Sequence, residues 1–440
     1  MMVNRHYKII TLGCKVNSYE SEGMANILEK HNFLVCNDKN QNPDVVIINT
    51  CTVTGVSDHK SRQMIRRAIK QYEGAKICVV GCYSQMAPSV VEKIDGVDII
   101  IGTKNRDKIG EYLEESYKNN SKIIDVQETL SNHVFDHLEV TSYYENTRAY
   151  LKIQDGCNNF CSFCIIPYAR GPVRSRPKND VLEEARKLVN NNFKEIVLTG
   201  IHTAGYGQDL INYRFSDLLG DLLKIKSLER LRISSIEESE IGEDFLEVMK
   251  KSNGIIVDHL HIPLQAGSDA ILKKMNRKYN TLQYEETINK IRKIYPDISI
   301  TTDVIVGFPG ESDELFEETY KFIEKIKYAQ LHVFPYSIRD NTPASFMKEQ
   351  INPAIKKERV KKLIALSNKL AIDYAKKFEK RIIKVLFETY DEKTKKVKGH
   401  TTNYLKVEAF GNKKMINTIK NVKIVKSGFP INQGIIVEGE

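Results

Sequence analysis

Three cysteines stand close together in the stretch from Cys157 to Cys164, which reads CNNFCSFC. The CxxxCxxC spacing allows three thiolates to wrap one metal centre from a single loop. A structural zinc site takes four ligands, and the one further Cys or His within about twenty residues on either side is His137. Three ligands therefore imply an open coordination site, and in a [4Fe-4S] cluster at Cys157, Cys161 and Cys164 one iron would be free to bind a small chelating ligand. The alternative is a zinc loop or a redox motif.

Three more cysteines, Cys14, Cys51 and Cys82, each follow directly on an expected strand. Because the carboxyl ends of parallel strands share one edge of an open sheet, we expect these thiols to converge. The alternative is that all three are packed in a core. Cys36 and Cys78 do not share this placement and are expected to be buried small hydrophobes.

The elements that would position these thiols begin with residues 1–116, where short β-branched runs alternate with helical patterns. This alternation predicts an α/β fold with a doubly wound parallel sheet. The expected strands are residues 7–12, 45–48, 77–80 and 98–101, and the first expected helix covers residues 20–30.

The polar residues 117–142 show weak periodicity and are expected to connect two domains. In residues 143–375 the alternation resumes on a larger scale, and six βα units predict a partial (β/α)6 barrel with the three-cysteine loop after its first strand. The expected strands are residues 149–153, 195–198, 231–234, 259–264, 298–306 and 330–335, and the expected helices include 181–190, 215–224, 281–294 and 355–378.

Residues 376–440 alternate in strand fashion, which predicts a small antiparallel β-barrel with strands at 382–388, 404–409, 415–419 and 421–425. Residues 379–440 hold 13 Lys and Arg against 7 Asp and Glu, so 6 of the net charge of +9 lies there. This skew indicates an anionic partner, unless the surface is only a solvated basic face.

The composition, with 41% apolar and 28% charged residues, is typical of a globular protein. The N-terminus lacks an apolar signal region, and no apolar run approaches the roughly 18 residues of a membrane span. We therefore expect a cytoplasmic protein without a membrane partner. Eight cysteines in such a chain favour metal ligands or reactive thiols over disulfides.

Five segments, spread over almost the whole chain, match the motifs of one known family: TLGCKVNSYESE, NTCTVT, CNNFCSFCIIPYARG, GFPGE and GHTTNYLKV. They resemble the methylthiotransferase branch of the radical S-adenosylmethionine superfamily, with a TRAM domain at the C-terminus. The resemblance implies two molecules of S-adenosylmethionine, one that gives a methyl group to sulfur and one that is cleaved to a 5'-deoxyadenosyl radical. It also implies two [4Fe-4S] clusters, a radical cluster on Cys157, Cys161 and Cys164 and an auxiliary cluster on Cys14, Cys51 and Cys82.

The segments most resemble the enzymes that add a methylthio group to C2 of N6-threonylcarbamoyladenosine beside the tRNA anticodon. Enzymes for isopentenyladenosine tend to show a GCQMN-like start and those for a ribosomal-protein aspartate a GCAKN-like start, whereas this chain has Lys15-Val16-Asn17 after the cysteine. The implied partners are tRNA rather than DNA and a reducing electron donor of flavodoxin or ferredoxin type. A competing class is an iron–sulfur RNA-binding protein without radical chemistry.

Further residues are candidate contacts on the rim of the central barrel, in the loop after the three cysteines and in the C-terminal barrel. The alternatives are a turn or cap residue on the rim and an ordinary solvated loop for the arginines. Guanidinium forks suit a phosphate or a carboxylate, and a tyrosine can stack on a base or fill the core. The candidate substrate contacts are Arg170, Arg174, Arg176 and Tyr404. The candidate cofactor contacts are Phe163, Thr199, Gly200, Ser234, Glu237, Gln265, Gly307, Gly310 and Glu311.

Overall fold

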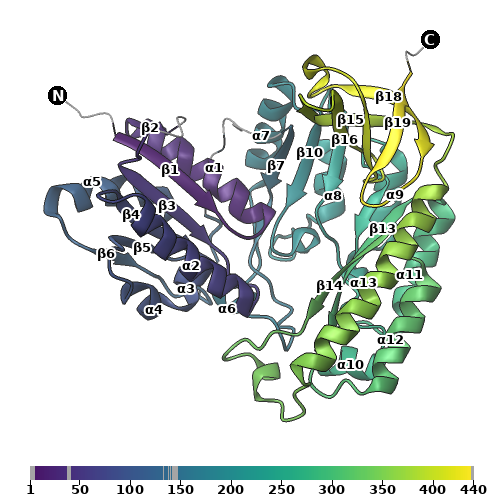
Figure 1. Cartoon of the computed structure of the whole chain (residues 1–440), viewed down its shortest axis with the longest axis horizontal. Helices are drawn as coiled ribbons and strands as arrows, with labels where there is room; N and C mark the ends of the chain where they lie inside the picture. The colour runs from purple at the N-terminus through teal and green to yellow at the C-terminus, as the bar shows by residue number, and fades with distance from the viewer. Residues whose placement is uncertain are drawn as a thin grey trace.

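The computed structural model describes residues 5–36, 41–131, 133–136, 138, 140 and 147–437. These residues form an N-terminal sheet, a central partial barrel and a small C-terminal barrel, which follow one another from purple to yellow in Figure 1. His137 lies outside the described residues. No helix within the described ranges is both long enough and apolar enough to cross a membrane.

The N-terminal sheet has six parallel strands with helices on both faces. Its elements are β1 (Arg5–Thr11), α1 (Lys15–Lys30), β2 (Phe33–Val35), β3 (Val45–Thr50), α2 (Gly55–Gln71), β4 (Lys76–Gly81), α3 (Cys82–Met86), α4 (Pro88–Glu92), β5 (Ile99–Ile101), α5 (Ile109–Asn119) and β6 (Ile123–Asp125). The strand order is β2-β1-β3-β4-β5-β6. Since α1 and α5 pack on one face and α2 on the other, the predicted doubly wound sheet is confirmed.

The two edge strands, β2 and β6, were not predicted. Each has only three residues and is partly exposed, so neither shows the apolar run that marks β3, which is buried along its whole length. With β6, the sheet extends into residues 117–142, where the sequence predicts a connector. The domain boundaries themselves stay a prediction.

The central barrel consists of two three-stranded parallel sheets, joined by a parallel bridge between Leu231 and Ile256. The sheets are β7 (Arg148–Lys152), β10 (Glu195–Thr199) and β11 (Arg230–Ile233), then β12 (His259–His261), β13 (Ser299–Val306) and β14 (Gln330–Pro335). A short antiparallel pair, β8 (Gln154–Asp155) and β9 (Arg174–Ser175), flanks the three-cysteine loop. The six predicted strands are thus present, and the barrel is open between β7 and β14.

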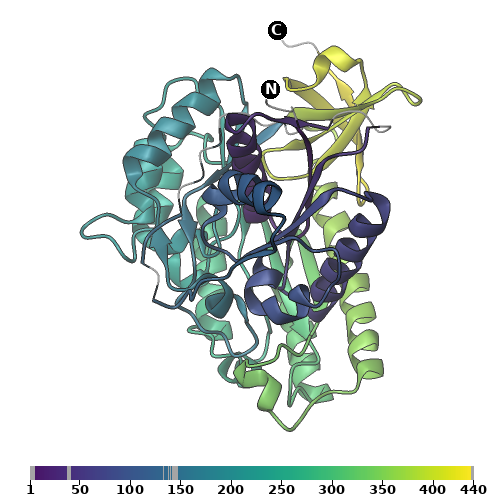
Figure 2. The ribbon, with the colours of Figure 1, turned by 90° about the vertical axis from the view of Figure 1, so that its left-hand side faces the viewer.

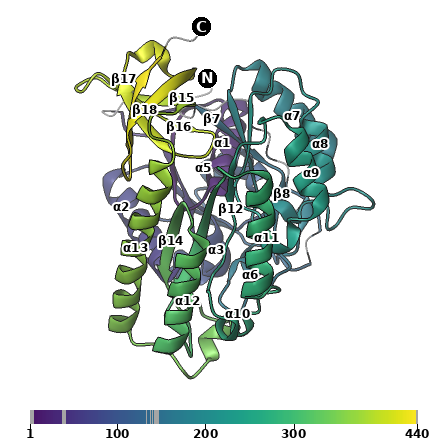
Figure 3. The same ribbon diagram turned by 90° about the vertical axis from the view of Figure 1, so that its right-hand side faces the viewer.

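Helices cover the outside of these strands, as Figures 1 and 3 show. Local signals start several of them; for example, the side chain of Asn280 accepts a hydrogen bond from the backbone of Gln283, and Ser312 caps Leu315 in the same way. The helices are α6 (Ile166–Arg170), α7 (Lys178–Asn190), α8 (Phe215–Leu222), α9 (Glu243–Lys251), α10 (Asp269–Lys274), α11 (Thr281–Ile294), α12 (Asp313–Ile326) and α13 (Pro353–Lys376).

The C-terminal strands close into a barrel in the order β15-β16-β17-β19-β18. They are β15 (Ile382–Asp391), β16 (Lys396–Thr401), β17 (Lys406–Phe410), β18 (Ile419–Lys426) and β19 (Asn432–Ile436). The prediction was wrong in two details: residues 415–419 are mostly a turn, and β17 runs parallel to β19. β16 and β19 were missed, since half of their positions are polar.

Buried arginines hold the C-terminal barrel against the central one. Arg230 donates to the backbone carbonyls of Lys384 and His400 at 3.0 and 3.2 Å, and Arg232 donates to that of Thr402 at 3.2 Å. In Figure 3, α13 leads up to this barrel, and Figure 2 shows the N-terminal sheet in front of the central strands. The three bodies therefore meet around one region.

Candidate functional site

Cys14, Cys51 and Cys82 come together at the carboxyl edge of the N-terminal sheet. They follow β1, β3 and β4, which are parallel neighbours. The thiols lie close enough for each to raise the pKa of another member of the trio. The order of the strands reverses between β1 and β3, which is where open α/β sheets bind ligands. Gly13 has a φ of +106°, and a Cβ there would lie 2.8 Å from Cβ of Cys51, so this turn requires glycine.

Arg170 brings a buried positive charge to this trio. Its Nε donates to Sγ of Cys82 at 3.2 Å, and its other nitrogens donate to Glu20 and Asp155. Burial raises the pKa of the Cys14 and Cys82 thiols, although the charge of Arg170 acts against this shift. A bound metal, which deprotonates a coordinating thiol, would let the exposed Cys14 and the buried Cys82 both ionise.

The second trio lies on the loop between β8 and α6. Its thiols are Cys157, Cys161 and Cys164, and neighbouring thiols of this trio raise the pKa values of Cys161 and Cys164. Burial is the main cause that raises the pKa of Cys164 to about 12, and the charge of Cys161 is the second. The hydroxyl of Ser162 donates to the carbonyl of Lys274 at 2.7 Å. The end of α10 thus fixes the loop that carries the three sulfurs.

Arg277 and His202 are charged neighbours of this second trio that the sequence did not reveal. Nη1 of Arg277 donates to Sγ of Cys161 at 3.2 Å. Nε2 of His202 lies 2.8 Å from the carboxylate of Glu240. Burial lowers the pKa of His202, but hydrogen bonds to Cys157 and Glu240 outweigh it and raise the pKa to about 10. Each trio therefore has a cation in contact with one of its sulfurs.

In neither cysteine trio do all three sulfurs lie within 4.8 Å of one another. Within the described residues, the one group of three ligand atoms that all lie within 4.8 Å of one another contains no cysteine. Zinc–sulfur bonds of about 2.3 Å would bring three thiolates closer together than that. Both trios therefore fit a centre wider than one ion, such as a [4Fe-4S] cluster with three cysteine ligands.

A cavity of about 750 Å³ lies where the three bodies meet, and residues of all three line it. It brings together five residues singled out by the sequence: Cys14, Thr199, Gly200, Ser234 and Tyr404. It therefore joins the sulfur of the N-terminal trio to the rim of the central barrel. The candidate cofactor contacts that do not line it are Phe163, Glu237, Gln265, Gly307, Gly310 and Glu311.

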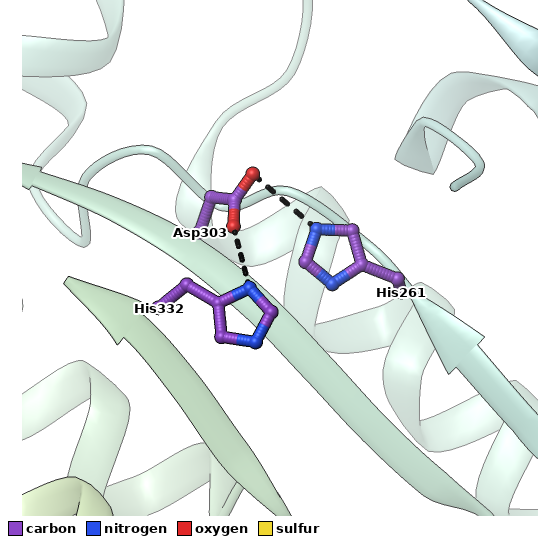
Figure 4. Close-up of side chains that lie close together, drawn as sticks. All are labelled: His261, Asp303 and His332. Carbon is purple, nitrogen blue, oxygen red and sulfur yellow. Dashed lines mark ion pairs between the residues drawn. The ribbon is translucent and has the colours of Figure 1, made fainter. Parts of the chain in front are cut away.

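One wall of this cavity carries a cluster that the sequence analysis missed, in which Asp303 lies between His261 and His332 (Figure 4). Nε2 of His261 and Nδ1 of His332 each lie 3.3 Å from an oxygen of the carboxylate. Burial raises the pKa of Asp303, but the hydrogen bonds and charges of the two histidines outweigh it and lower the pKa. The cluster therefore presents an ionised carboxylate between two imidazoles.

The GFPGE segment forms a turn that is held from within the protein. The backbone N–H of Gly307 donates to Glu311 at 2.6 Å, and Arg359 donates to the same carboxylate at 2.6 Å. A Cβ on Gly310 would lie 2.1 Å from Nζ of Lys274. The segment is tightly packed, and its contact with a cofactor stays a prediction.

The other rim residues lie beside the cluster loop or in the strand ends. The Glu237 carboxylate lies 3.1 Å from Nη2 of Arg277, and the hydroxyls of Ser234 and Thr203 are 2.9 Å apart. Gln265 has a φ of +66° and pairs through its backbone with β13. Their role as cofactor contacts also stays a prediction.

The three arginines after the cluster loop are buried and paired within the protein. Arg170 contacts the N-terminal trio, Arg174 donates to the carbonyl of Arg170 at 2.7 Å, and Arg176 lies 2.7 Å from Glu184. Arg176 also donates to the hydroxyl of Tyr19 in α1 at 3.1 Å. These contacts tie the N-terminal sheet to the central barrel; a contact with substrate stays a prediction.

Tyr404 lies between the C-terminal barrel and the central barrel. Its ring is stacked on those of His259 and His400, with centroids 4.8 Å away in both cases, and its hydroxyl accepts a hydrogen bond from Arg148 at 3.2 Å. The residue lines the cavity. Stacking on a base stays a prediction.

Comparison with known proteins decides the family. Residues 151–323 match the radical SAM superfamily, and residues 6–102 match UPF0004, a family described as uncharacterized. A threonylcarbamoyladenosine tRNA methylthiotransferase, MtaB, of Bacillus subtilis (strain 168) is 46% identical over 97% of this chain and 95% of its own length. The chain belongs to the radical SAM tRNA methylthiotransferase family.

Two further relatives are less similar to this chain than the B. subtilis protein is. A protein of the same name from Aquifex aeolicus is 38% identical over 86% of this chain and 91% of its own length. A tRNA-2-methylthio-N(6)-dimethylallyladenosine synthase of Clostridium tetani is 37% identical over 95% of this chain and 93% of its own length. This chain is therefore more similar to the B. subtilis MtaB protein, at 46% identity, than to the C. tetani dimethylallyladenosine synthase, at 37%.

Among solved structures, the radical S-adenosylmethionine methyltransferase TsrM from Kitasatospora setae superposes with a TM-score of 0.60 at 14% identity. The match covers 78% of this chain and 77% of TsrM. At this identity the likeness concerns the fold alone, and it agrees with a sheet domain followed by a partial barrel.

Proposed function

We propose that this methylthiotransferase adds a methylthio group to C2 of N6-threonylcarbamoyladenosine beside the anticodon of tRNA. The observation that carries the proposal is the cavity that has Cys14 on one wall and Thr199, Gly200 and Ser234 on another. A base bound there reaches the sulfur-bearing edge of the N-terminal sheet and the rim of the barrel together. The identity of 46% to the B. subtilis enzyme supports the choice of nucleoside.

The two cysteine trios would hold the cofactors. Cys157, Cys161 and Cys164 are the proposed ligands of the radical cluster, and the auxiliary cluster is assigned to Cys14, Cys51 and Cys82. When bound, S-adenosylmethionine and the two [4Fe-4S] clusters would supply the methyl group, the sulfur and the radical that removes hydrogen. The C2–H bond of adenine has no acidic proton, so acid–base catalysis alone would not suffice.

Positively charged side chains of the protein lie beside the proposed cluster ligands and would stabilise the negative charge of the clusters. Arg277 contacts Cys161 and Arg170 contacts Cys82, so each anionic cluster has a guanidinium within hydrogen-bond distance of a sulfur. His202, whose pKa is raised by Cys157 and Glu240, adds a further positive group. Candidate contacts to S-adenosylmethionine are Phe163, Thr199, Gly200, Ser234, Glu237, Gln265, Gly307, Gly310 and Glu311.

The proposed division of the chain is an N-terminal cluster domain (1–116), a connector (117–142), a radical core (143–375) and an RNA-binding barrel (376–440). Exposed lysines on the last part, for example Lys413, Lys420 and Lys423, are suited to the RNA backbone. The proposal also includes a flavodoxin- or ferredoxin-like electron donor and a cytoplasmic location.

Nucleoside mass spectrometry of tRNA from cells with and without this gene tests the proposal. The expected result is loss of the 2-methylthio group from threonylcarbamoyladenosine, with its return when the gene is restored. Loss from the isopentenyl nucleoside would instead assign the other tRNA activity of the family. Unchanged tRNA would favour a ribosomal-protein substrate or an RNA-binding protein without radical chemistry.

A further inference from the structure

Lys15 is the first residue of α1 and follows directly on Cys14. It lines the 750 Å³ cavity, where the other ionisable groups on the walls are Arg232, Asp303 and three histidines, apart from Cys14 and Tyr404. The cavity therefore has two permanent cations and a single carboxylate on its walls. Such a lining suits a ligand that carries a negative charge.

Lys15 differs from Arg232 and Asp303 in its ion-pair partners. Arg232 lies 2.6 Å from Glu195, and Asp303 lies 3.3 Å from each of two imidazoles. In the described part of the chain, by contrast, no carboxylate lies within 4.0 Å of Nζ of Lys15. Among the described residues, Lys15 is thus the cation of this cavity that forms no ion pair with a carboxylate.

Neighbouring groups make this charge costly without a ligand. Burial disfavours the charge of Lys15, and Arg148 and Arg232 repel it. Tyr404 and Glu195 attract it, but Glu195 is shared among Arg148, Arg230 and Arg232. The side chain of Lys15 is half-buried, so water shields it only in part. An anionic group in the cavity would relieve this repulsion and form a charge-assisted hydrogen bond.

The names of the relatives refer to two tRNA nucleosides, and these differ in charge. The threonylcarbamoyl group ends in a carboxylate, whereas the dimethylallyl group is an uncharged hydrocarbon. We infer that Lys15 binds the carboxylate of the threonylcarbamoyl group and so selects this nucleoside over the hydrocarbon-bearing one. The inference rests on the proposed function, and it adds that the adenine is held directly beside Cys14.

The test uses the full-length protein with both clusters loaded and two synthetic anticodon stem-loops. One carries threonylcarbamoyladenosine and the other its methyl ester, which is larger by one methyl group and lacks the charge. The wild-type protein should turn over the acid roughly 10- to 100-fold more efficiently, in kcat/KM, than the ester, because the ester loses a charged hydrogen bond. In Lys15→Gln this ratio should fall close to one, and Lys15→Arg should retain most of it.

The ratio is measured within one protein, so a change in cluster content or folding of the variant cancels out. Lys30→Gln, which removes the same charge from the other end of α1, is the matched control and should keep the wild-type ratio. A Lys15→Gln variant that keeps the wild-type ratio overturns the inference. So does one that loses acid and ester activity equally, since Lys15 would then serve an RNA phosphate or the cluster.

Failure of the proposed function gives a different result. A wild-type protein that modifies neither stem-loop, but modifies one with isopentenyladenosine, contradicts the choice of nucleoside before any variant is made. A wild-type protein that modifies acid and ester equally supports the proposed function and contradicts the role of Lys15 alone.

Discussion

Nε of Arg170 donates a hydrogen bond to Sγ of Cys82 at 3.2 Å, although the two residues are 88 positions apart. The same guanidinium donates to Glu20 and Asp155, which places one buried cation between the N-terminal sheet and the central barrel. The contact couples the proposed auxiliary cluster to the interface of the two bodies. Loss of Arg170 should therefore affect both.

Arg170→Met should lower the free energy of unfolding by about 1–3 kcal/mol, because Glu20 and Asp155 lose a buried charged hydrogen-bond donor, although Lys152 still pairs with both. It should also reduce the iron bound by the N-terminal trio. Chemical denaturation and iron analysis measure the two effects. Lys187→Met, which breaks an exposed pair with Glu183, is the control and should cost no more than about 1 kcal/mol. A variant as stable as the wild type would contradict the role of Arg170.

The two trios should bind iron independently. Anaerobically reconstituted protein should hold about eight irons, four for each cluster, and replacement of Cys157, Cys161 and Cys164 by Ala should leave about half. The complementary replacement of Cys14, Cys51 and Cys82 should leave the other half, with 5'-deoxyadenosine still released from S-adenosylmethionine. Iron that falls to zero in either variant would argue against two separate sites.

The two remaining cysteines provide the control for this experiment. Cys78 is buried inside β4, where burial raises its pKa, and Cys36 is half-buried and donates to the carbonyl of Gln41. The position of Cys78 confirms the burial predicted for it, whereas Cys36 was predicted to be buried and is only half-buried. Cys36→Ala and Cys78→Ala should therefore keep the full iron content.

Local sequence signals were sufficient for the strands that form the cores. Strand β3 spans Val45–Thr50 and includes the predicted 45–48, because a parallel strand covered on both faces contains an apolar run. Short edges such as β2 lack that run. The parallel pairing of β17 with β19 depends on closure of the whole barrel, which no local pattern specifies.

The residues of the candidate site also include some that local sequence patterns predict and some that they do not. The cysteines were readable because three share a loop and three follow strand ends. Arg277, in contrast, reaches Cys161 from 116 residues away, and such a distant contact leaves no mark on spacing. For His261 and Asp303 a signal existed, because charged residues stand within otherwise buried strands.

Asp303→Asn should remove the charge that pairs with His261 and His332. Since the folded state lowers the pKa of Asp303, its ionised form stabilises the protein at pH values above the ordinary range of about 4. That stabilisation is lost as the pH falls below this range, because the unfolded state then binds the additional proton. The midpoint of thermal unfolding should therefore be lower in the variant at pH 5, and the gap should narrow by pH 3.

The expected loss at pH 5 is roughly 1–3 kcal/mol, the usual contribution of hydrogen bonds to a charged group. Asp297→Asn is the control, because Asp297 forms an exposed pair with Arg381 at 2.8 Å. Its effect should be smaller than that of Asp303→Asn. A gap between wild type and Asp303→Asn that stays constant from pH 5 to pH 3 would contradict the assignment.

Neutralisation of two exposed lysines of β18, Lys420→Gln with Lys423→Gln, should weaken tRNA binding and make it less sensitive to salt. For each lysine that no longer binds a phosphate, the slope of log affinity against log salt concentration should fall by about one. Fluorescence titrations at several salt concentrations measure this slope. The same double change at Lys321 and Lys325 in α12 leaves the C-terminal barrel intact and should preserve the slope. Equal slopes for the wild type and the β18 variant would remove this strand from the RNA-binding surface.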